Sequence, residues 1–509
     1  MQFGAWESVD HWGRYRPSSA AIRWNGTTVT FCELKALVDV LGEAIADRCA
    51  GFQRVAIAIR SKAHLLAGIL AILRCGKSVT LLNTGLPLEA LRTNLQDADS
   101  AAIVHDEGLR DIAHMIPAAR RRALNITQDL ALAPNAAFPD RGPQQTQSPP
   151  AARTSRDEWG VLFSSGTTGV PKGIERNHES MVTELVGWCL ELGLNRDTCF
   201  YIGRPIYYTG GLVLALSTLL VGGQVVLDDY GDPNSFDEVW AAYQRFLSSE
   251  RAAFAFFVPD QLRAFVAAVD RAGVAPLAAH SVLVMGGPIA GPEKMRAARV
   301  LRSRIVESWG NTESLGTITD PEDVELRPDS IGRPFLTDSM CIVDENCEPL
   351  PPRQLGRIAG GEEAGFDGYS GRPEATQRTK RSGLIVSEDL GYVDDAGYFY
   401  VRGREQECVV VGGVTLFLSE IERKLRMSTR VRACCVAACP VGEGHSELAA
   451  MVVTASPDVT PASLLQDLNA LLDAQERLAH VALADALPCL PSGKVNRLAI
   501  AEQLRDQAW

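Results

Sequence analysis

The stretch Val161-Leu-Phe-Ser-Ser-Gly-Thr-Thr-Gly-Val-Pro-Lys-Gly-Ile-Glu175 has the composition of an anion-binding loop. Its first three residues are apolar and predict the end of a buried strand. The segment Ser164–Gly173 then combines hydroxyls, glycines and one lysine. Glycines allow backbone N–H groups to turn toward an anion, and a lysine adds a mobile positive charge. The stretch therefore predicts a cradle for a polyphosphate.

The order of residues differs from the Walker loop, in which the lysine directly follows the last glycine. Here Val170-Pro171 precede Lys172, and Gly173 follows it. An isolated run of glycine, serine and threonine also fits a polar surface loop, but the strict order of this run favours the cradle. The residues predicted to bind the phosphates are Ser164, Ser165, Gly166, Thr167, Thr168 and Lys172.

The segment Ser164–Gly173 resembles the phosphate-binding loop of the adenylate-forming superfamily, which includes acyl- and aryl-CoA ligases, peptide-synthetase adenylation domains and luciferases. The resemblance extends from about Trp24 to Arg505 and is greatest to stand-alone ligases. It implies an α/β fold with a large N-terminal lobe of mixed sheets flanked by helices and a small mobile C-terminal α+β domain. The implied domains are residues 1–405 and 406–509, with a hinge at Gln406.

Length and composition agree with an ordinary globular protein of two or more domains. The chain has 509 residues, of which 46% are hydrophobic and 22% are charged. The net charge of −12 argues against a general nucleic-acid or anionic-membrane surface. The twelve cysteines are scattered without zinc-ligand spacing, and no secretory signal is visible, so we expect a cytoplasmic protein with reduced thiols.

Short apolar segments alternate with helical patterns in the N-terminal part of the chain. Strands are expected at 55–59, 79–82 and 101–105, and helices at 63–75 and 87–96. Such alternation predicts a largely parallel sheet covered by helices. The proline-rich segment 133–156 predicts an extended connection that leads to the phosphate loop.

A second group of polar residues lies in Glu307-Ser-Trp-Gly-Asn-Thr-Glu-Ser314. Trp309 offers an aromatic face for a purine, Gly310 permits close approach, and Glu313 offers an oxygen ligand suited to Mg²⁺. The segment resembles the family motif Tyr-Gly-x-Thr-Glu, with tryptophan in place of tyrosine. The resemblance implies catalytic roles for Thr312 and Glu313 and metal binding by Glu313. The implied cofactor-binding residues here are Glu307, Ser308, Trp309 and Gly310, together with Gly286 and Gly287 in an earlier strand-to-glycine turn.

The chain continues with two further matches to the family. Gly368–Thr376 matches a Gly-Tyr…Arg-Pro-Glu-Ala-Thr stretch, and Ser387–Gly391 stands where the family has Thr-Gly-Asp-Leu-Gly. Asp389 is predicted to accept both ribose hydroxyls, although an aspartate in a turn is the alternative. Arg404 precedes the hinge and is predicted to contact ribose or phosphate.

The C-terminal segment carries the expected acceptor channel and the catalytic lysine. Residues 409–422 predict a strand, a Gly-Gly turn and a helix capped by Ser419. By resemblance, Gly412 and Gly413 line a tunnel for the acceptor thiol, but Val411 replaces the basic residue usual in CoA ligases. Lys494 lies in Pro-Ser-Gly-Lys-x-x-Arg and matches the family's catalytic lysine, whereas an isolated lysine would be a solvated surface charge.

The acid pocket is expected around Arg204-Pro-Ile-Tyr-Tyr-Thr-Gly-Gly-Leu212. Tyr208 stands where the family closes the acyl pocket with a histidine or an aromatic residue, so we assign it to the catalytic and pocket residues. A tyrosine packed in the core is the alternative. Small glycines beside aromatic residues suit a flat ring or a short chain. The predicted pocket residues are Tyr208, Gly210, Gly211, Met285, Asn311 and Ser314.

The resemblance implies ATP-dependent activation of a small carboxylic acid as an acyl-adenylate, with Mg²⁺ as cofactor and coenzyme A as co-substrate. Two alternatives stay open: transfer in trans to a carrier-protein thiol or an amine, and a non-catalytic nucleotide-binding relic. Retention of Lys172, Glu313, Asp389, Arg404 and Lys494 argues against the relic. No nucleic-acid or membrane partner is expected, and a homodimer is compatible with the resemblance.

Overall fold

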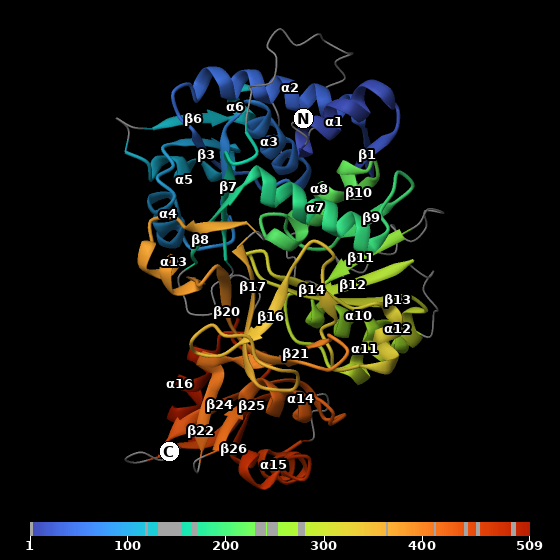
Figure 1. Ribbon diagram of the computed structural model, residues 1–509, viewed down its shortest axis with the longest axis vertical. Helices are drawn as coiled ribbons and strands as arrows, with labels where there is room; N and C mark the ends of the chain where they lie inside the picture. Colours follow the sequence, from blue (N-terminus) through green and yellow to red (C-terminus); the bar gives the residue numbers. More distant parts are fainter. Residues whose placement is uncertain are drawn as a thin grey trace. The chain divides into compact units, whose positions relative to one another are not determined.

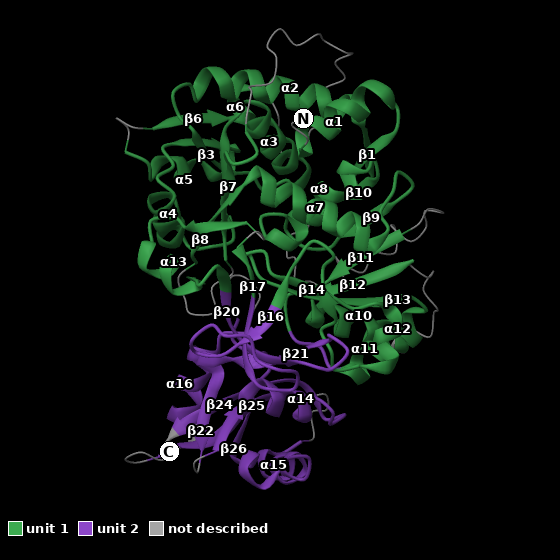
Figure 2. Cartoon of the chain, viewed as in Figure 1, with its two compact units in different colours: residues 1–287, 291–340, 360–385 green, residues 288–290, 341–359, 386–509 purple. Residues whose placement is uncertain are grey.

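The chain folds as two compact units in the computed structural model (Figure 1, Figure 2). Unit 1 comprises residues 1–287, 291–340 and 360–385, and unit 2 comprises residues 288–290, 341–359 and 386–509. The residues that the structure describes are 4–117, 121–130, 154–164, 171–229, 241, 253–272, 280–362, 365–411, 414–441, 446–454, 459–489 and 495–508.

A seven-stranded sheet in unit 1 carries the phosphate-loop stretch. Its strand order is β18-β8-β7-β4-β3-β5-β6. The pairs from β7 to β6 are parallel, while β8 runs antiparallel to both β7 and β18. The strands are β3 (Arg54–Ala58), β4 (Ser78–Leu81), β5 (Ala102–His105), β6 (Arg122–Asn125), β7 (Glu158–Phe163), β8 (Gly173–Asn177) and β18 (Phe366–Tyr369).

A nine-stranded sheet in unit 1 carries the second predicted motif. Its order is β15-β14-β13-β12-β11-β9-β10-β1-β2, with a parallel centre from β13 to β1 and antiparallel strands at both ends. The strands are β1 (Ala20–Trp24), β2 (Thr27–Thr30), β9 (Cys199–Ile202), β10 (Gln224–Val226), β11 (Ala253–Phe257), β12 (Ser281–Met285), β13 (Arg304–Gly310), β14 (Gly316–Ile318) and β15 (Arg333–Pro334).

Helices pack between and around these sheets. Every residue of α3 (Lys62–Arg74) is buried, as are nearly all of α8 (Thr209–Leu220), because both helices are apolar on all sides. Their side chains join those of both sheets in one core. The other helices of unit 1 are α1 (Ala5–Tyr15), α2 (Phe31–Arg48), α4 (Leu88–Asp97), α5 (Arg110–His114), α6 (Ile126–Asp129), α7 (His178–Leu192), α10 (Pro259–Ala272), α11 (Gly291–Leu301), α12 (Pro321–Leu326) and α13 (Pro373–Thr379).

Unit 2 is an α+β assembly with cores of its own. The chain enters it within β20 (Leu384–Val393), which pairs antiparallel with β19 (Lys380–Arg381) at its start and with β21 (Phe399–Arg404) farther on. The short β16 (Met340–Val343) and β17 (Gly356–Gly361) precede this strand. The later elements in the described part of this unit are η3 (Glu405–Glu407), β22 (Cys408–Val411), β23 (Val414–Phe417), α14 (Leu418–Leu425), β24 (Val431–Pro440), β25 (Ser446–Thr454), α15 (Pro461–Asn469), η4 (Ala474–Glu476), β26 (Leu478–Leu483) and α16 (Arg497–Ala508).

The mixed α/β fold expected from the sequence is confirmed, and the N-terminal strands and helices lie within a residue or two of their predicted bounds.

Residues 409–422 differ from the expectation, since a second strand, β23, lies between the glycine pair and α14. Ser419 is not the helix cap. The cap position is Phe417, and the Ser419 hydroxyl donates to the Arg402 carbonyl at 2.8 Å. The domains 1–405 and 406–509 and the hinge at Gln406 stay predictions.

Candidate active site

The phosphate-loop stretch is the connection of a β-hairpin. β7 and β8 pair antiparallel, with Phe163 opposite Gly173. At the base of the loop, the Ser164 amide donates to the Lys172 carbonyl at 2.9 Å, and the Lys172 amide donates to the Ser164 hydroxyl at 3.1 Å. A Walker loop leads from a strand into a helix, whereas this loop leads from strand to strand. Both ends of the predicted cradle are therefore held on one sheet.

The predicted metal ligand lies in a tight turn between β13 and β14. The Asn311 amide donates to the Leu315 carbonyl at 3.0 Å, and the Leu315 amide donates to the Asn311 side-chain oxygen at 2.9 Å. Ser314 adopts a left-handed φ of 75°, which is uncommon for a residue with a side chain. The Asn311 side-chain oxygen thus closes the turn that presents Glu313.

Glu313 meets the phosphate-loop lysine through one aromatic ring. The Tyr369 hydroxyl donates to Glu313 Oε1 at 2.5 Å, and Lys172 Nζ lies 5.0 Å from the centre of the Tyr369 ring. Trp309 packs against the apolar cluster that contains Tyr369. The structure therefore brings together Lys172 of the phosphate loop and Trp309 and Glu313 of the Glu307–Ser314 segment.

The carboxylate of Glu307, a predicted cofactor-binding residue, forms an ion pair with a buried lysine. Glu307 is 6% exposed, and its Oε2 accepts from Lys294 Nζ at 2.6 Å. Lys294 also donates to the Ser330 carbonyl at 3.1 Å. Burial raises the pKa of Glu307, against the opposing effect of the Lys294 charge. This buried pair holds α11 to β13, so the geometry favours a structural role for the Glu307 carboxylate over a cofactor contact. Ser308 is also buried, in register with Met285.

The predicted pocket residues Tyr208, Gly210 and Met285 lie close together. A Cβ added to Gly210 would lie 3.2 Å from the Met285 sulfur and terminal methyl group, so glycine leaves room that a larger residue would fill. The Tyr208 ring meets the Tyr207 ring edge-on at 4.9 Å, and the Tyr208 hydroxyl accepts from Asn83 Nδ2 at 3.1 Å. Burial raises the pKa of Tyr208, so its hydroxyl stays protonated near neutral pH.

The two predicted glycine sites of this pocket differ. Gly286 follows β12 with a φ of 94°, a conformation that favours glycine, and Gly287 comes next. Gly211 is packed inside α8, where an added Cβ would lie 3.1 Å from the Pro205 carbonyl oxygen. Gly211 therefore serves helix packing, while Gly286 leaves backbone accessible to a ligand at the end of β12.

The predicted ribose-binding residues are partners of each other in unit 2. Asp389 on β20 lies opposite Arg404 on β21, and Arg404 Nε donates to Asp389 Oδ1 at 3.2 Å. Asp389 lies in a strand, so the alternative of a turn aspartate does not apply. A carboxylate and a guanidinium group are the kinds of group with which a diol or a phosphate pairs.

The residues on either side of the segment that contains the predicted catalytic lysine are described. Cys489 and Val495 form an isolated antiparallel β-bridge through their backbones. The Asn496 backbone amide donates to the Pro488 carbonyl at 2.8 Å. Arg497, the first residue of α16, donates through both terminal nitrogens to Glu422 at 2.5 and 2.9 Å. Lys494 itself lies outside the described residues, as do Ser165, Gly166, Thr167, Thr168, Gly412 and Gly413.

Sequence reasoning missed the residues that support the site. Asn83 holds Tyr208, Tyr369 joins Lys172 to Glu313, and Arg497 anchors the lysine loop. Tyr369 and Arg497 lie within motifs that resemble the family's motifs, so their positions could have indicated a role in the site. Asn83 is distant from Tyr208 in the sequence, so their contact could be found only from the fold.

Two findings bear on membranes and metals. Within the described part of the chain, every helix is too short or too polar to cross a membrane. The same residues contain no cluster of three or more histidine, cysteine, aspartate or glutamate side chains that could hold a metal. A magnesium ion that travels with a nucleotide needs only one or two protein carboxylates, because phosphates and water supply its other ligands. Glu313 fits that requirement.

Comparisons with known proteins agree with this geometry. A feruloyl-CoA synthase of an Amycolatopsis species is 28% identical over 493 residues, which cover 95% of each chain. The structure of an O-succinylbenzoate coenzyme A synthetase from Bacillus subtilis, in complex with ATP and a magnesium ion, superimposes with a TM-score of 0.83 at 21% identity, covering 97% of this chain and 99% of that one. The amide bond synthetase McbA from Marinactinospora thermotolerans has a TM-score of 0.80 at 21% identity, covering 98% and 99%.

These structural likenesses establish a common fold. The family described as AMP-binding enzyme matches residues 9–370, which include the phosphate loop, the Glu307–Ser314 segment and Tyr369. The match covers most of the chain, and the chain therefore belongs to the AMP-binding enzyme family.

Proposed function

We propose that this enzyme activates a carboxylic acid with ATP, releases pyrophosphate, and passes the acyl group of the resulting acyl-adenylate to the thiol of coenzyme A. The observation that carries the proposal is the meeting of Lys172 and Glu313 on Tyr369, at the base of a hairpin loop rich in backbone donors. A cation and a carboxylate that both contact one ring suit the phosphates of a nucleotide and its magnesium ion.

Each group would have a defined task. The Ser164–Lys172 loop would hold the β- and γ-phosphates, and Lys494 would neutralise charge between the α-phosphate and the incoming carboxylate. Phosphoryl chemistry of this kind asks the protein mainly for positioning and charge stabilisation. Glu313 would hold Mg²⁺, which supplies charge neutralisation at the phosphate oxygens. Asp389 and Arg404 would bind the ribose.

The acid pocket favours a flat ring or a short chain. Tyr208, with its neighbour Tyr207, offers aromatic surface, and Met285 lies beside the side-chain-free Gly210. The similarity to a feruloyl-CoA synthase supports an aromatic acid. Activity with long-chain acids alone would contradict this part of the proposal.

Coenzyme A is the favoured acceptor because the curated relative that covers 95% of the chain is a CoA-dependent synthase. Val411 stands where CoA ligases often carry a basic residue, which keeps amines and carrier-protein thiols as the second candidates. A carrier-protein acceptor and a homodimer remain predictions from the sequence.

The decisive experiment measures pyrophosphate release from ATP and Mg²⁺ across a library of carboxylic acids, with and without coenzyme A. We expect release that depends on an aryl or short acid and an acyl-CoA product identified by its mass. Release with an amide product in the presence of amines, and no acyl-CoA, would favour the second candidate. Absence of release with every acid would contradict catalysis.

The control for this experiment is Lys494→Ala. Removal of the lysine should abolish formation of the acyl-adenylate, whereas transfer from chemically prepared acyl-adenylate to coenzyme A should continue. Adenylation at the wild-type rate would show that another group balances charge at the α-phosphate.

A further inference from the structure

Tyr369 occupies a fixed place at the end of β18. The side chain is 6% exposed, and its ring packs edge-on against Phe366 with centroids 4.8 Å apart. The backbone amide donates to the Thr376 hydroxyl at 2.8 Å, and the residue pairs with Ile174 of β8 in the sheet. Because both backbone and ring are held, the hydroxyl and the ring face point in defined directions.

The hydroxyl of Tyr369 orients the carboxylate of Glu313. The O–H···O distance of 2.5 Å is that of a charge-assisted hydrogen bond, which is stronger than a bond between neutral groups. Among the described residues, Tyr369 is the only hydrogen-bond partner of Glu313, and the contact uses Oε1. This contact thus holds the carboxylate through Oε1.

The face of the same ring lies near the ammonium group of Lys172. The distance of 5.0 Å from Nζ to the ring centre is within the range of a cation–π contact. The backbone beside Tyr369 is also bonded to the start of β8, since the next residue, Ser370, donates its amide to the Gly173 carbonyl at 2.8 Å. One side chain therefore touches both a phosphate-loop cation and the predicted metal ligand.

We infer that Tyr369 is a positioning residue for Mg·ATP, which sets the Glu313 carboxylate for single-oxygen coordination of the metal and keeps Lys172 beside it. The inference rests on the proposed function, in which Glu313 binds Mg²⁺ and Lys172 binds phosphate. Two different parts of the Tyr369 side chain make the two contacts: the hydroxyl contacts Glu313, and the ring contacts Lys172. Tyr369→Phe removes the first contact alone, and Tyr369→Leu removes both.

The test measures ATP binding by titration calorimetry at a series of Mg²⁺ concentrations, without any acid, so that no turnover occurs. For Tyr369→Phe we expect the half-saturating Mg²⁺ concentration to rise about 10-fold, as for other groups that orient a metal ligand. At saturating Mg²⁺, Tyr369→Leu should bind ATP about 2- to 5-fold more weakly than Tyr369→Phe. A wild-type magnesium dependence in Tyr369→Phe would overturn the inference.

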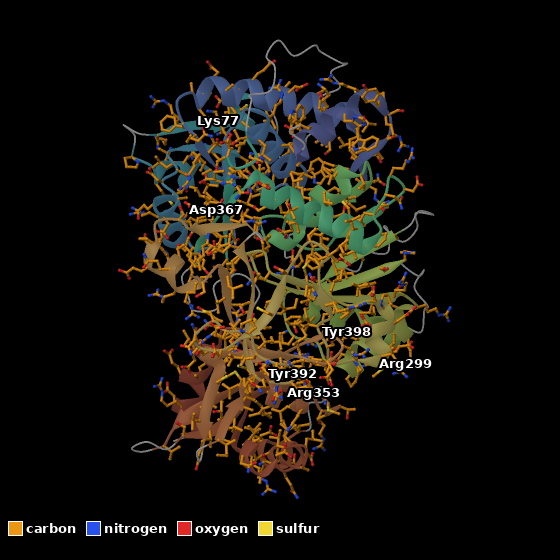
Figure 3. The ribbon with its side chains drawn as sticks, in the orientation of Figure 1. Lys77, Arg299, Arg353, Asp367, Tyr392 and Tyr398 are labelled. Carbon is orange, nitrogen blue, oxygen red and sulfur yellow. The ribbon has the colours of Figure 1, made fainter. Side chains whose placement is uncertain are left out.

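The matched control is Tyr398→Phe, which removes a hydroxyl from another buried tyrosine, 8% exposed and labelled in Figure 3. Its magnesium dependence should equal that of the wild type, and an equal shift would overturn a specific role for Tyr369. Glu313→Gln separates this inference from the proposed site. If Glu313→Gln alters the magnesium dependence and Tyr369→Phe does not, only the positioning role fails. If neither variant alters it, the assignment of Glu313 as metal ligand fails as well.

Discussion

At the scale of single residues, the predicted acid pocket contains a hydrogen bond that joins distant parts of the chain. The side-chain amide of Asn83 donates to the Tyr208 hydroxyl at 3.1 Å. The guanidinium carbon of Arg204 lies 5.9 Å from the centre of the Tyr208 ring. Tyr208 also precedes the first turn of α8, which contains Gly210. The orientation of this ring therefore sets one wall of the pocket.

Asn83→Ala should weaken binding of the acid without weakening binding of ATP. Loss of one hydrogen bond of ordinary strength predicts a rise of about 3- to 10-fold in the KM of the acid. Steady-state pyrophosphate release, with acid and ATP varied in turn, measures both constants. Asn346→Ala, at an exposed turn, is the control. An equal rise in the KM of ATP would point to a general distortion of the site instead.

Asp338 gives the protein a pH-dependent stability. Burial, opposed by the Thr337 hydroxyl, raises the pKa of Asp338 from 3.8 to about 7. The folded state therefore binds this proton more tightly than the unfolded state, and stability falls as pH rises from about 4 to about 7. Asp338→Asn should therefore stabilise the protein more at pH 8 than at pH 4.5, by roughly 1–2 kcal/mol, part of the effect being screened by solvent.

Thermal unfolding at these two pH values checks the prediction. The exposed Asp197→Asn serves as control and should have the same small effect at both pH values. If Asp338→Asn were no more stabilising at pH 8 than at pH 4.5, the carboxyl group would not carry a raised pKa.

At the scale of elements, unit 2 anchors the lysine loop through the first residue of α16. Arg497 forms a two-point pair with Glu422 of α14, which is 1% exposed, and its Nε lies 3.3 Å from Glu407 of η3. The Val436 amide donates to the same Glu422 at 2.9 Å. Three elements thus meet at the residue that closes the loop of Lys494, and η3 contains the predicted hinge.

Arg497→Lys should slow acyl-adenylate formation more than acyl transfer. Lysine keeps the positive charge and can still pair with Glu422, but it lacks the planar guanidinium group that binds a carboxylate at two points. We therefore expect the position of the loop to be less well defined. Removal of the charge would cost about 3–5 kcal/mol and unfold part of the unit, which makes the conservative change the informative one. We expect about a 10-fold slower exchange of pyrophosphate into ATP, with transfer from prepared acyl-adenylate within a factor of two. Arg505→Lys, exposed on the same helix, is the control; equal losses in both half-reactions would contradict a specific role.

The sequence predicted the elements with strong periodicity and the residues with distinctive chemistry. The strands from β3 to β5 and the helix α3 were found because apolar residues predominate in them. The extra strand β23 was missed because Val414–Phe417 directly adjoin a helix, and short apolar runs do not distinguish the two. The pairing of Glu307 with Lys294 could not be predicted either, since α11 and β13 are joined only by packing.

At the scale of the whole molecule, the chain has separate cores for its two units. Ile421, Leu464 and Leu468 belong to a core within unit 2, while Leu66, Leu214 and Phe200 belong to a core within unit 1. The residues of this unit 2 core all follow residue 406, and elements that share a core move together, so a rotation of this part would be absorbed by the backbone of a few residues. Gln406, the middle residue of η3, is the predicted pivot.

Gln406→Pro tests this pivot directly. Proline fixes φ near −65°, a value compatible with a 3₁₀ turn, so the substitution should preserve the present backbone and prevent its rotation. We expect one half-reaction to stay within a few-fold of the wild type and the other to fall about 100-fold, because each requires its own placement of the small domain. Pyrophosphate exchange and transfer from prepared acyl-adenylate measure the two steps separately, with Gln406→Ala as the control. Equal rates in both steps would place the pivot elsewhere, and equal losses in both would indicate damage to η3 rather than a blocked rotation.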